Sequence, residues 1–295
     1  MWVLISGNLL NILGNWILIY GKLGAPELGI LGGGLSTLFS RIFMAVVMAF
    51  IFFVRPKYHD YARGFLDGII NRKDFLEINR MGWPIALQMG METASFSLAS
   101  IVVGWIGVTA LAAHQVMLTI SQLGFMVYYG IGAAAVRVSN AIGQRDYEAA
   151  QGNAWAAFHI VLVIAVIVSI PIFLFRNSLG SIFTDSAEVS RLVAWIVIPF
   201  IIYQFGDAMQ IVFGNSLRGT SYVRPLVLYA FIAFFIVSLP LCYVFAIVFQ
   251  WGLMGVWFSF PFGLTTAGLL YMNAFRKRLR ALRQEKHLGF NNSIE

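Results

Sequence analysis

The chain has 295 residues, of which 59% are apolar and 11% are charged. A soluble domain carries roughly a quarter charged residues, so this composition excludes a protein whose entire surface faces water. The net charge is +7, and the one cysteine, Cys242, leaves no material for a disulfide framework or a cysteine-based metal site.

Apolar stretches recur along the chain and predict membrane-spanning helices. A spanning helix needs ~20 mostly apolar residues, because the hydrocarbon core is ~30 Å thick and each residue rises ~1.5 Å. Runs such as Ile160–Phe175 lack the alternation of a transmembrane β-strand. We therefore predict an all-α polytopic bundle of about eight spans: Trp2–Tyr20, Leu28–Val54, Met81–Ile106, Leu111–Val136, Ala149–Phe175, Leu192–Val212, Val223–Phe249 and Leu253–Phe275.

The longest hydrophilic break, residues 55–80, divides the predicted spans into two before it and six after it. It mixes acidic and basic residues with apolar ones at helical spacing, which predicts an amphipathic cytoplasmic linker at the membrane interface. We therefore expect a helical pair over 1–54, a linker over 55–80, a six-helix bundle over 81–276 and a basic cytoplasmic tail over 277–295.

Basic residues gather on one side of this predicted topology. Loops on the opposite side hold Lys22, Arg176 and Arg191. The positive-inside rule places the richer side and both termini in the cytoplasm, so the basic balance indicates topology rather than nucleic-acid binding. The cytoplasmic set is Arg55, Lys57, Arg63, Arg72, Lys73, Arg80, Arg137, Arg145, Arg218, Arg224, Arg276, Lys277, Arg278, Arg280, Arg283 and Lys286.

Two carboxylates lie deep inside predicted spans. Glu92 stands in the third span and Asp207 in the sixth. An isolated acid at the membrane centre costs several kcal/mol, so it is by default a functional candidate. We expect each group to exchange a proton for Na⁺ or a cationic drug, whereas the structural alternative is an acid that is permanently hydrogen-bonded and stiffens the bundle.

Neutral polar residues accompany both acids on the same helical faces. Tyr203 precedes Asp207 by four residues and Gln210 follows it by three, while Gln88 precedes Glu92 by four. Residues at these spacings share one face of a helix.

A second polar pair, Asn11 and Asn15, lies on one face of the first span. Such amides could either contact a substrate or tie helices together.

Four segments, in order along the chain, resemble the NorM-type transporters of the multidrug and toxic compound extrusion (MATE) family. Residues 10–29 resemble the region of the fifth and sixth helices in that family. The second-lobe resemblance rests on Ala112–Val116, Arg137–Gly143 and Tyr203–Gln210, the last followed by Ser216–Gly219. The resemblance implies two six-helix lobes around a central cavity, of which this chain would hold two helices of the first lobe and all six of the second.

The family resemblance also implies an activity and roles for individual residues. It implies drug export by alternating access, driven by Na⁺ or H⁺, with no cofactor beyond the coupling ion. It assigns cation coupling to Glu92, Tyr203 and Asp207, and it places Asn11, Asn15 and Gln115 among polar residues that face the cavities. Gln88 and Gln210 extend the same polar faces. The first four helices of the family pattern, with their acid, have no counterpart in Met1–Val54.

The leading hypothesis is therefore a cation-coupled antiporter in the bacterial inner membrane, exporting amphiphilic and often cationic compounds. Its expected partners are small-molecule drugs, the lipid membrane and the missing amino-terminal helices. One alternative is a non-transporting half-transporter, and another is a lipid-linked oligosaccharide flippase, which would favour a cavity lined with Arg and Lys. Hydrolase, zinc-protease and P-loop motifs do not occur in the sequence, which argues against an enzyme.

Overall fold

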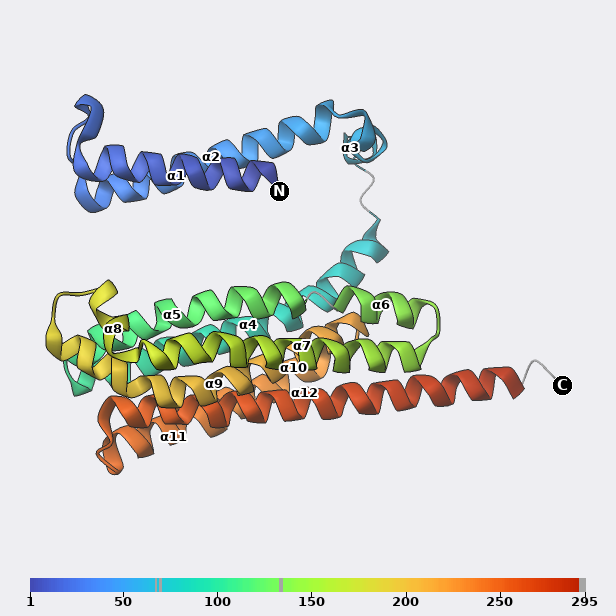
Figure 1. Cartoon of the computed structure of the whole chain (residues 1–295). Helices are drawn as coiled ribbons and strands as arrows, with labels where there is room; N and C mark the ends of the chain where they lie inside the picture. The colour runs from blue at the N-terminus through green and yellow to red at the C-terminus, as the bar shows by residue number, and fades with distance from the viewer. Residues whose placement is uncertain (67, 69–70, 133–134, 292–295) are drawn as a thin grey trace. The chain divides into compact units, whose positions relative to one another are not determined.

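A computed structural model describes residues 1–66, 68, 71–132 and 135–291 as a helical membrane protein (Figure 1). Within these residues, eight helical segments are long and apolar enough to cross a membrane. The described part of the chain contains helices and turns but no strand. The predicted fold class and the number of spans are thereby confirmed.

The chain divides into two compact units, Met1–Phe75 and Leu76–Glu295. The first unit contains α1 (Trp2–Tyr20) and α2 (Gly29–Val54), joined through the short 3₁₀ turn η1 (Lys22–Gly24). A second 3₁₀ turn, η2 (Pro56–Tyr58), and the amphipathic helix α3 (His59–Leu66) follow.

Helices α1 and α2 pack through small and polar residues. Gly32 lies against the backbone of Leu18, where a Cβ atom would meet the Leu18 carbonyl group. The Asn11 amide donates to Thr37 Oγ1 at 3.2 Å, and Ser36 Oγ donates to the Asn11 carbonyl at 2.9 Å. In lipid, close backbone approach and interhelical hydrogen bonds replace the hydrophobic driving force between helices.

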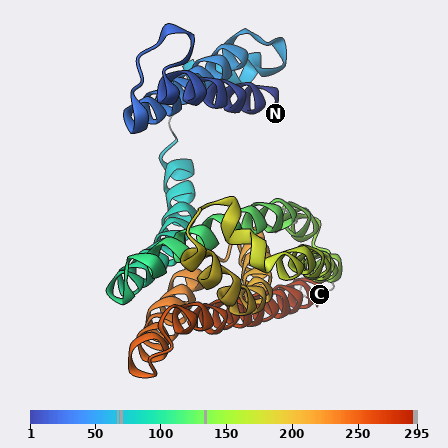
Figure 2. The same ribbon diagram turned by 60° about the vertical axis from the view of Figure 1, so that its left-hand side comes forward.

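The second unit is a bundle of six spans. Its elements are α4 (Arg72–Ile106), α5 (Val108–Gly132), α6 (Ala135–Gly143), α7 (Tyr147–Leu174), α8 (Arg176–Leu179), η3 (Gly180–Ile182), α9 (Ala187–Gly219), α10 (Arg224–Ala230), η4 (Phe231–Ser238), α11 (Leu239–Tyr243), η5 (Val244–Val248) and α12 (Gly252–Asn291). After a 60° turn, the red helix α12 lies along the lower side of this unit, next to the orange segment that precedes it (Figure 2).

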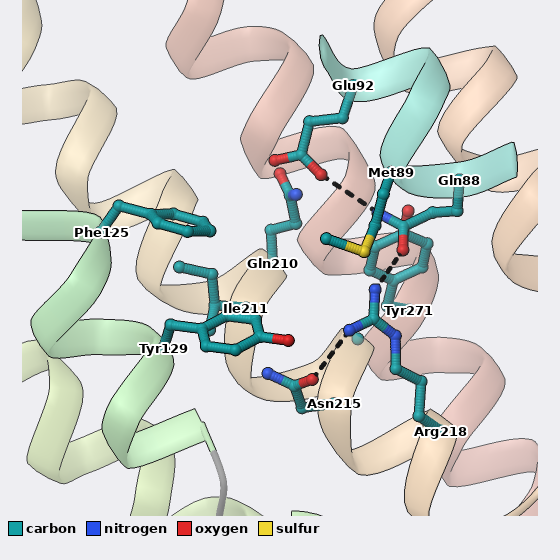
Figure 3. A pocket seen from close by; sticks show the side chains of 11 residues that line it. Gln88, Met89, Glu92, Phe125, Tyr129, Gln210, Ile211, Asn215, Arg218 and Tyr271 are labelled. Carbon is teal, nitrogen blue, oxygen red and sulfur yellow. Dashed lines mark hydrogen bonds between the residues drawn. The ribbon is translucent and has the colours of Figure 1, made fainter. Parts of the chain in front are cut away.

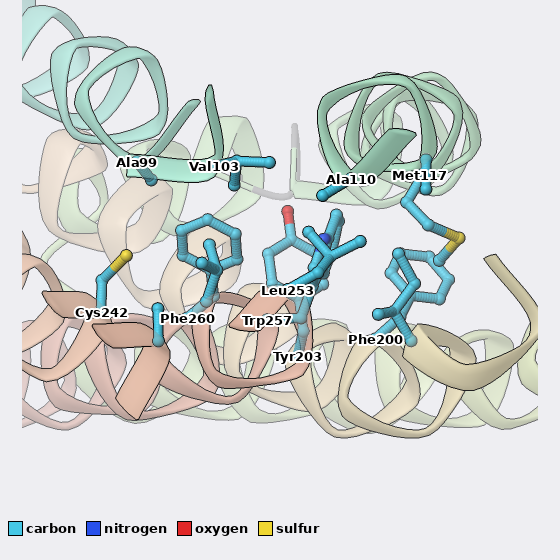
Figure 4. Close-up of a cluster of buried hydrophobic side chains, with 14 of the residues drawn as sticks. Ala99, Val103, Ala110, Met117, Phe200, Tyr203, Cys242, Leu253, Trp257 and Phe260 are labelled. Carbon is cyan, nitrogen blue, oxygen red and sulfur yellow. The ribbon is translucent and has the colours of Figure 1, made fainter. Parts of the chain in front are cut away.

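Aromatic rings fill the core of the bundle between α4, α5, α9 and α12 (Figure 4). Trp257 is fully buried and packs edge-on against Phe260 and Phe200, with ring centroids 5.4 and 5.9 Å apart. Tyr203 stacks on Phe200 at 5.7 Å. Edge-to-face and offset contacts of this kind add stabilisation beyond the area that they bury. The core therefore holds α9 and α12 rigidly at the place where the polar residues of α9 begin.

The seventh span changes its helical pitch along its length. Two π-helical segments, η4 and η5, lie on either side of the short α-helix α11, which contains Pro240. A π-turn adds a residue per turn and is often found at functional positions. Gly263 of α12 lies against Ser238, so α12 packs closely on this irregular span.

Several helices extend beyond the predicted spans. Helix α4 begins at Arg72 rather than near Met81, and α12 continues to Asn291 rather than ending near Phe275. Hydropathy detects only the apolar part of a helix, whereas backbone hydrogen bonding continues into water. The predicted fourth span, Leu111–Val136, includes residues 133–134, which lie outside the described part; α5 is described from Val108 to Gly132, and Val136 belongs to α6.

Candidate functional site: two acids within the six-helix bundle

A polar pocket opens between α4, α5, α9 and α12 (Figure 3). Helix α4 contributes Gln88, Met89 and Glu92, and the other helices contribute the remaining lining residues. Because α4 is helical from Arg72 to Ile106, Gln88 and Glu92 project from one face toward α9. The residues from the other helices are Phe125, Tyr129, Gln210, Ile211, Gly214, Asn215, Arg218 and Tyr271.

A hydrogen-bonded chain joins a cation to an acid inside this pocket. The Arg218 guanidinium donates to Gln88 Oε1 through Nη2 and to Asn215 Oδ1 through Nη1, the latter at 3.0 Å. Gln88 Nε2 in turn donates to Glu92 Oε2 at 3.1 Å (Figure 3). The opposite orientation of the Gln88 amide would set donor against donor at Arg218 and acceptor against acceptor at Glu92. Arg218 therefore determines which end of Gln88 faces the carboxylate.

Other polar atoms in the pocket have no partner among the described residues. These buried atoms are Gln210 Oε1, Tyr271 OH and Arg218 Nε. Buried polar groups in native proteins are nearly always satisfied by protein, water or a bound ion. The pocket thus has unused hydrogen-bonding capacity next to Glu92.

Asp207 and Tyr203 precede Gln210 in α9 by about one and two turns and lie outside the lining of this pocket. Asp207 is 2% exposed, and within the described residues no hydrogen bond ends on its carboxylate. The charge of Glu92 acts on Asp207, and both carboxylates act on the Tyr203 hydroxyl. Two acids and a tyrosine from α4 and α9 therefore share one electrostatic environment.

A second buried network lies beside Asp207. The Tyr128 hydroxyl donates to Gln204 Oε1, and Gln204 Nε2 donates to Ser169 Oγ at 3.0 Å. These side chains come from α5, α9 and α7, and all three are buried. The network ties three helices together at the depth of the acid, which limits how far the Asp207 carboxylate can move without breaking interhelical bonds.

The structure brings some of the predicted site residues together and separates others. Glu92, Gln88 and Gln210 line the pocket, with Asp207 and Tyr203 buried beside it. Gln115 is exposed on α5 and does not line the pocket.

The other predicted pair, Asn11 and Asn15, belongs to the first unit. Asn15 Nδ2 donates to Asn11 Oδ1 at 3.3 Å, and the Asn11 side chain bonds to α2. Here the two amides bond to each other and to the neighbouring helix.

The pocket also contains residues that the sequence did not single out. Arg218 was assigned to a cytoplasmic loop, but it lies in the last turn of α9, half-buried against Gln88. Its spacing could have indicated this position: eleven residues after Asp207 is three helical turns, so the two side chains share a face. Asn215 and Tyr271 carry no comparable signal, because their roles depend on packing between helices.

His114 lies apart from the acids, within the aromatic core. It is fully buried, bonded to Ser100 Oγ through Nε2 at 3.0 Å and packed against Trp257. Within the described residues, no group of three or more His, Cys, Asp or Glu side chains is arranged to hold a metal ion. His114 thus links α4 to α5 in the core rather than extending the acidic site.

Comparisons with known proteins agree with the resemblance stated above. The family model described as MatE matches residues 84–244. The multidrug resistance protein NorM of Aliivibrio fischeri is 31% identical over 272 residues, which are 88% of this chain and 58% of that protein. The multidrug resistance protein MdtK of Proteus mirabilis is 32% identical over 271 residues, covering 90% of this chain and 59% of that protein.

Solved structures share the fold. A crystal structure of MATE in the straight conformation superposes with a TM-score of 0.81 at 22% identity, covering 96% of this chain and 63% of that chain. A crystal structure of MATE in the bent conformation superposes with a TM-score of 0.79 at 20% identity, covering 96% of this chain and 62% of that chain. This chain spans less than two thirds of the length of each of these relatives.

Proposed function

Because the chain belongs to the MatE family, a family of transporters rather than enzymes, we propose that it carries the cation-coupling bundle of a multidrug exporter. In this proposal Glu92 and Asp207 bind Na⁺ or H⁺ with the help of Tyr203. Binding and release of that cation drive alternating access, and amphiphilic, often cationic small molecules are exported in exchange. The observation that carries the proposal is the presence of two carboxylates in one bundle, Asp207 buried in α9 and Glu92 half-buried in the polar pocket beside it.

Electrostatics explain why such a pair suits coupling. Two negative charges in a medium of low dielectric constant repel each other strongly and lose their hydration. A cation or proton bound at either acid removes the repulsion between the two charges and the desolvation cost of the acid that it neutralises. The packing of α4 against α9 is therefore more favourable with the ion than without it, and this difference is what allows an ion to shift a conformational equilibrium.

Gln88 and Arg218 give the site a competitor for the incoming ion. In the described state, Gln88 Nε2 occupies part of the Glu92 carboxylate. A cation at Glu92 must displace this donor or share the carboxylate with it. When Gln88 turns away, its bond to Arg218 must also rearrange. Ion binding is thereby linked to a contact between α4 and the end of α9.

Export of cationic drugs fits the pocket better than transport of a polyanion. A lipid-linked oligosaccharide carries phosphate groups and favours a cavity with several Arg and Lys residues. The charged side chains in the described pocket are Glu92 and Arg218, and Arg218 is already bonded to Gln88 and Asn215. The pocket itself has a volume of about 30 Å³, which suits an ion or a water molecule rather than a drug. In this proposal it therefore binds the coupling ion, and the amphiphile binds elsewhere.

Transport by the purified chain in phospholipid vesicles tests the proposal, with ethidium as the cationic dye and Na⁺ and pH gradients imposed in opposite directions. We expect ethidium movement to follow one gradient, which identifies the ion. Asp207→Asn should reduce movement to background, whereas Glu188→Gln, an exposed acid on the same helix, should not change it. Dye movement by Asp207→Asn at the wild-type rate would refute the coupling role. Cation binding without dye movement in the wild type would support the half-transporter alternative.

A further inference from the structure

Three arginines form a row along the polar end of α12, next to the start of α7. Arg276, Arg280 and Arg283 are spaced by four and then three residues, so they lie on one face of the helix. Together with Gln151 and Leu279 they line a groove. This groove lies outside the acidic pocket and shares no lining residue with it.

Neighbouring side chains of α7 hold two of these guanidinium groups in place. The Arg276 guanidinium carbon lies 5.1 Å from the centre of the Trp155 ring, a cation–π contact. Arg283 Nη2 donates to Gln151 Oε1 at 3.0 Å and to the Tyr147 carbonyl at 3.4 Å. Arg283 Nε is buried with no partner among the described residues. The groove is therefore preorganised, because part of its cationic lining is already oriented.

The charge of the row is not neutralised by the protein. Within the described residues, none of the three arginines forms an ion pair, and the contacts of Arg283 are with neutral groups. Among nearby acids, Glu148 lines an adjoining groove together with Arg283, but it forms no ion pair with it among the described residues. Three guanidinium groups in a row without a counter-charge favour an anion with several acceptor oxygens.

The depth of the row in the membrane indicates which anion this is. Arg276 lies 24 residues after Gly252, the first residue of α12, which corresponds to about 36 Å of helix. The hydrocarbon core is ~30 Å thick, so Arg276 falls where headgroups begin. Trp155 beside it is the residue type enriched at this level. We propose that the groove between α7 and α12 binds the phosphate headgroup of an anionic phospholipid such as phosphatidylglycerol.

The general preference for positive charge on one side of a membrane does not explain this arrangement. Two further basic residues of the same turn, Lys277 and Arg278, lie on other faces of α12. Lys277 is exposed, and Arg278 packs over the Tyr222 ring at 5.4 Å. A purely topological signal would treat all five residues alike, whereas a headgroup site depends on the three that line the groove. This difference supplies a matched control with the same change in charge.

The test measures binding of fluorescent phosphatidylglycerol to the full chain purified in a neutral detergent, with phosphatidylcholine of the same acyl chains as competitor. Removal of two charge-assisted contacts with one headgroup should weaken affinity about thirtyfold. We therefore expect about this loss for the pair Arg276→Gln and Arg280→Gln. The control pair Lys277→Gln and Arg278→Gln should retain wild-type affinity.

Three results would overturn the proposal. One is equal loss in both pairs of variants, which would indicate diffuse attraction. Another is displacement of the lipid by inorganic phosphate alone, which would identify a site for free anions. The third is equal retention of phosphatidylglycerol and phosphatidylcholine by the wild-type chain, counted by native mass spectrometry, which would exclude headgroup selectivity. This measurement needs no variant, so it holds even if a variant fails to fold.

Discussion

The helical pair α1–α2 and the helices α9 and α12 are about equally apolar but differ greatly in burial. Their most apolar windows have mean hydropathies of 1.5 and 2.3 for α1 and α2, against 1.7 and 1.4 for α9 and α12. In those windows 6% and 11% of the residues are buried in the first pair, and 61% in both helices of the second. Hydropathy therefore predicts that a helix crosses the membrane but not how deeply it is buried within its own unit.

Polar residues behave differently in these two settings. In α1, Asn11 and Asn15 are half-exposed and bond to each other and across to α2. In α9, Asp207 and Gln210 are almost fully buried, and each has oxygen atoms without a hydrogen-bond donor among the described residues. One buried amide oxygen, Asn15 Oδ1, also lacks a partner in the first setting. The two settings differ in charge: α1 holds neutral amides that bond between helices, whereas α9 buries a carboxylate. The following variants test this contrast, from the largest expected effect to the smallest.

Removing the charge of Asp207 should have the largest effect on cation binding. In the proposed site, Asp207 and the bound cation form a buried pair of opposite charges. Loss of one partner of such a pair costs ~3–5 kcal/mol, so we expect Asp207→Asn to weaken binding of the coupling cation at least a hundredfold. Isothermal titration of the purified chain with Na⁺, and proton uptake on acidification, measure this directly. Glu188→Gln should bind as the wild type does, and a similar loss in that control would show that net charge rather than the site is being measured.

A methyl group on the close-packed side of α12 should destabilise the bundle. A Cβ atom at position 255 would meet the backbone of Phe245 and Ala246, so Gly255→Ala requires a shift of η5. Overpacking of this kind costs ~1–3 kcal/mol. In contrast, Gly34 of α2 has open space around it, and Gly34→Ala should leave stability unchanged or slightly increased. Unfolding of both variants in mixed micelles measures their stability. Equal losses in the two variants would show that α2 and α12 tolerate an added methyl group equally, against this prediction.

Neutralising Arg218 should increase cation affinity. Arg218→Gln removes a positive charge near Glu92 and frees the Gln88 amide to present its oxygen atom toward the carboxylate. Both changes favour a bound cation, and at an effective dielectric constant of ~20 we expect a gain of about 1 kcal/mol, or roughly fivefold. Arg224→Gln, an exposed residue at the start of α10, is the matched control. Weaker binding by Arg218→Gln would mean that Arg218 supports the cation site rather than competing with the ion.

The smallest effect is expected in the helical pair. Asn11→Ala removes the bond to Thr37 Oγ1 between α1 and α2, and an interhelical bond in a membrane contributes ~0.6 kcal/mol on average. Thr119→Ala, whose hydroxyl bonds only to the Gln115 carbonyl in its own helix among the described residues, serves as the control. We expect Asn11→Ala to lower the free energy of unfolding and to leave cation binding unchanged. A loss of cation binding would contradict a purely structural role.

Much of the fold could be predicted from the sequence because its signals are local. The first span, Trp2–Tyr20, matches α1 at both ends, since an apolar run between turns defines a spanning helix by itself. The resemblance to the MATE family, based on four ordered motifs, is confirmed by the family match over residues 84–244. The ends of α4 and α12 could not be predicted, because their charged extensions leave the hydrocarbon region without leaving the helix.

The site was less accessible to prediction because it depends on contacts between helices. The helical spacings of Glu92 and Asp207 from their polar neighbours are properties of single helices and could be predicted. The bridge from Arg218 through Gln88 to Glu92 joins α9 to α4 across 130 positions of sequence. The unpartnered hydroxyl of Tyr271 likewise depends on how α12 packs against the pocket. The assignment of cation coupling to Glu92, Tyr203 and Asp207 remains a prediction.

A double-mutant cycle for cation binding tests most directly whether the two acids form one site. The cycle measures the affinity of the purified chain for its coupling ion in the wild type, Glu92→Gln, Asp207→Asn and the double variant. If the acids share one ion, the double variant should bind no more weakly than the weaker single variant, which gives a coupling energy above ~1 kcal/mol. Losses that add within ~0.5 kcal/mol would show that Glu92 and Asp207 act independently and would contradict the shared cation site.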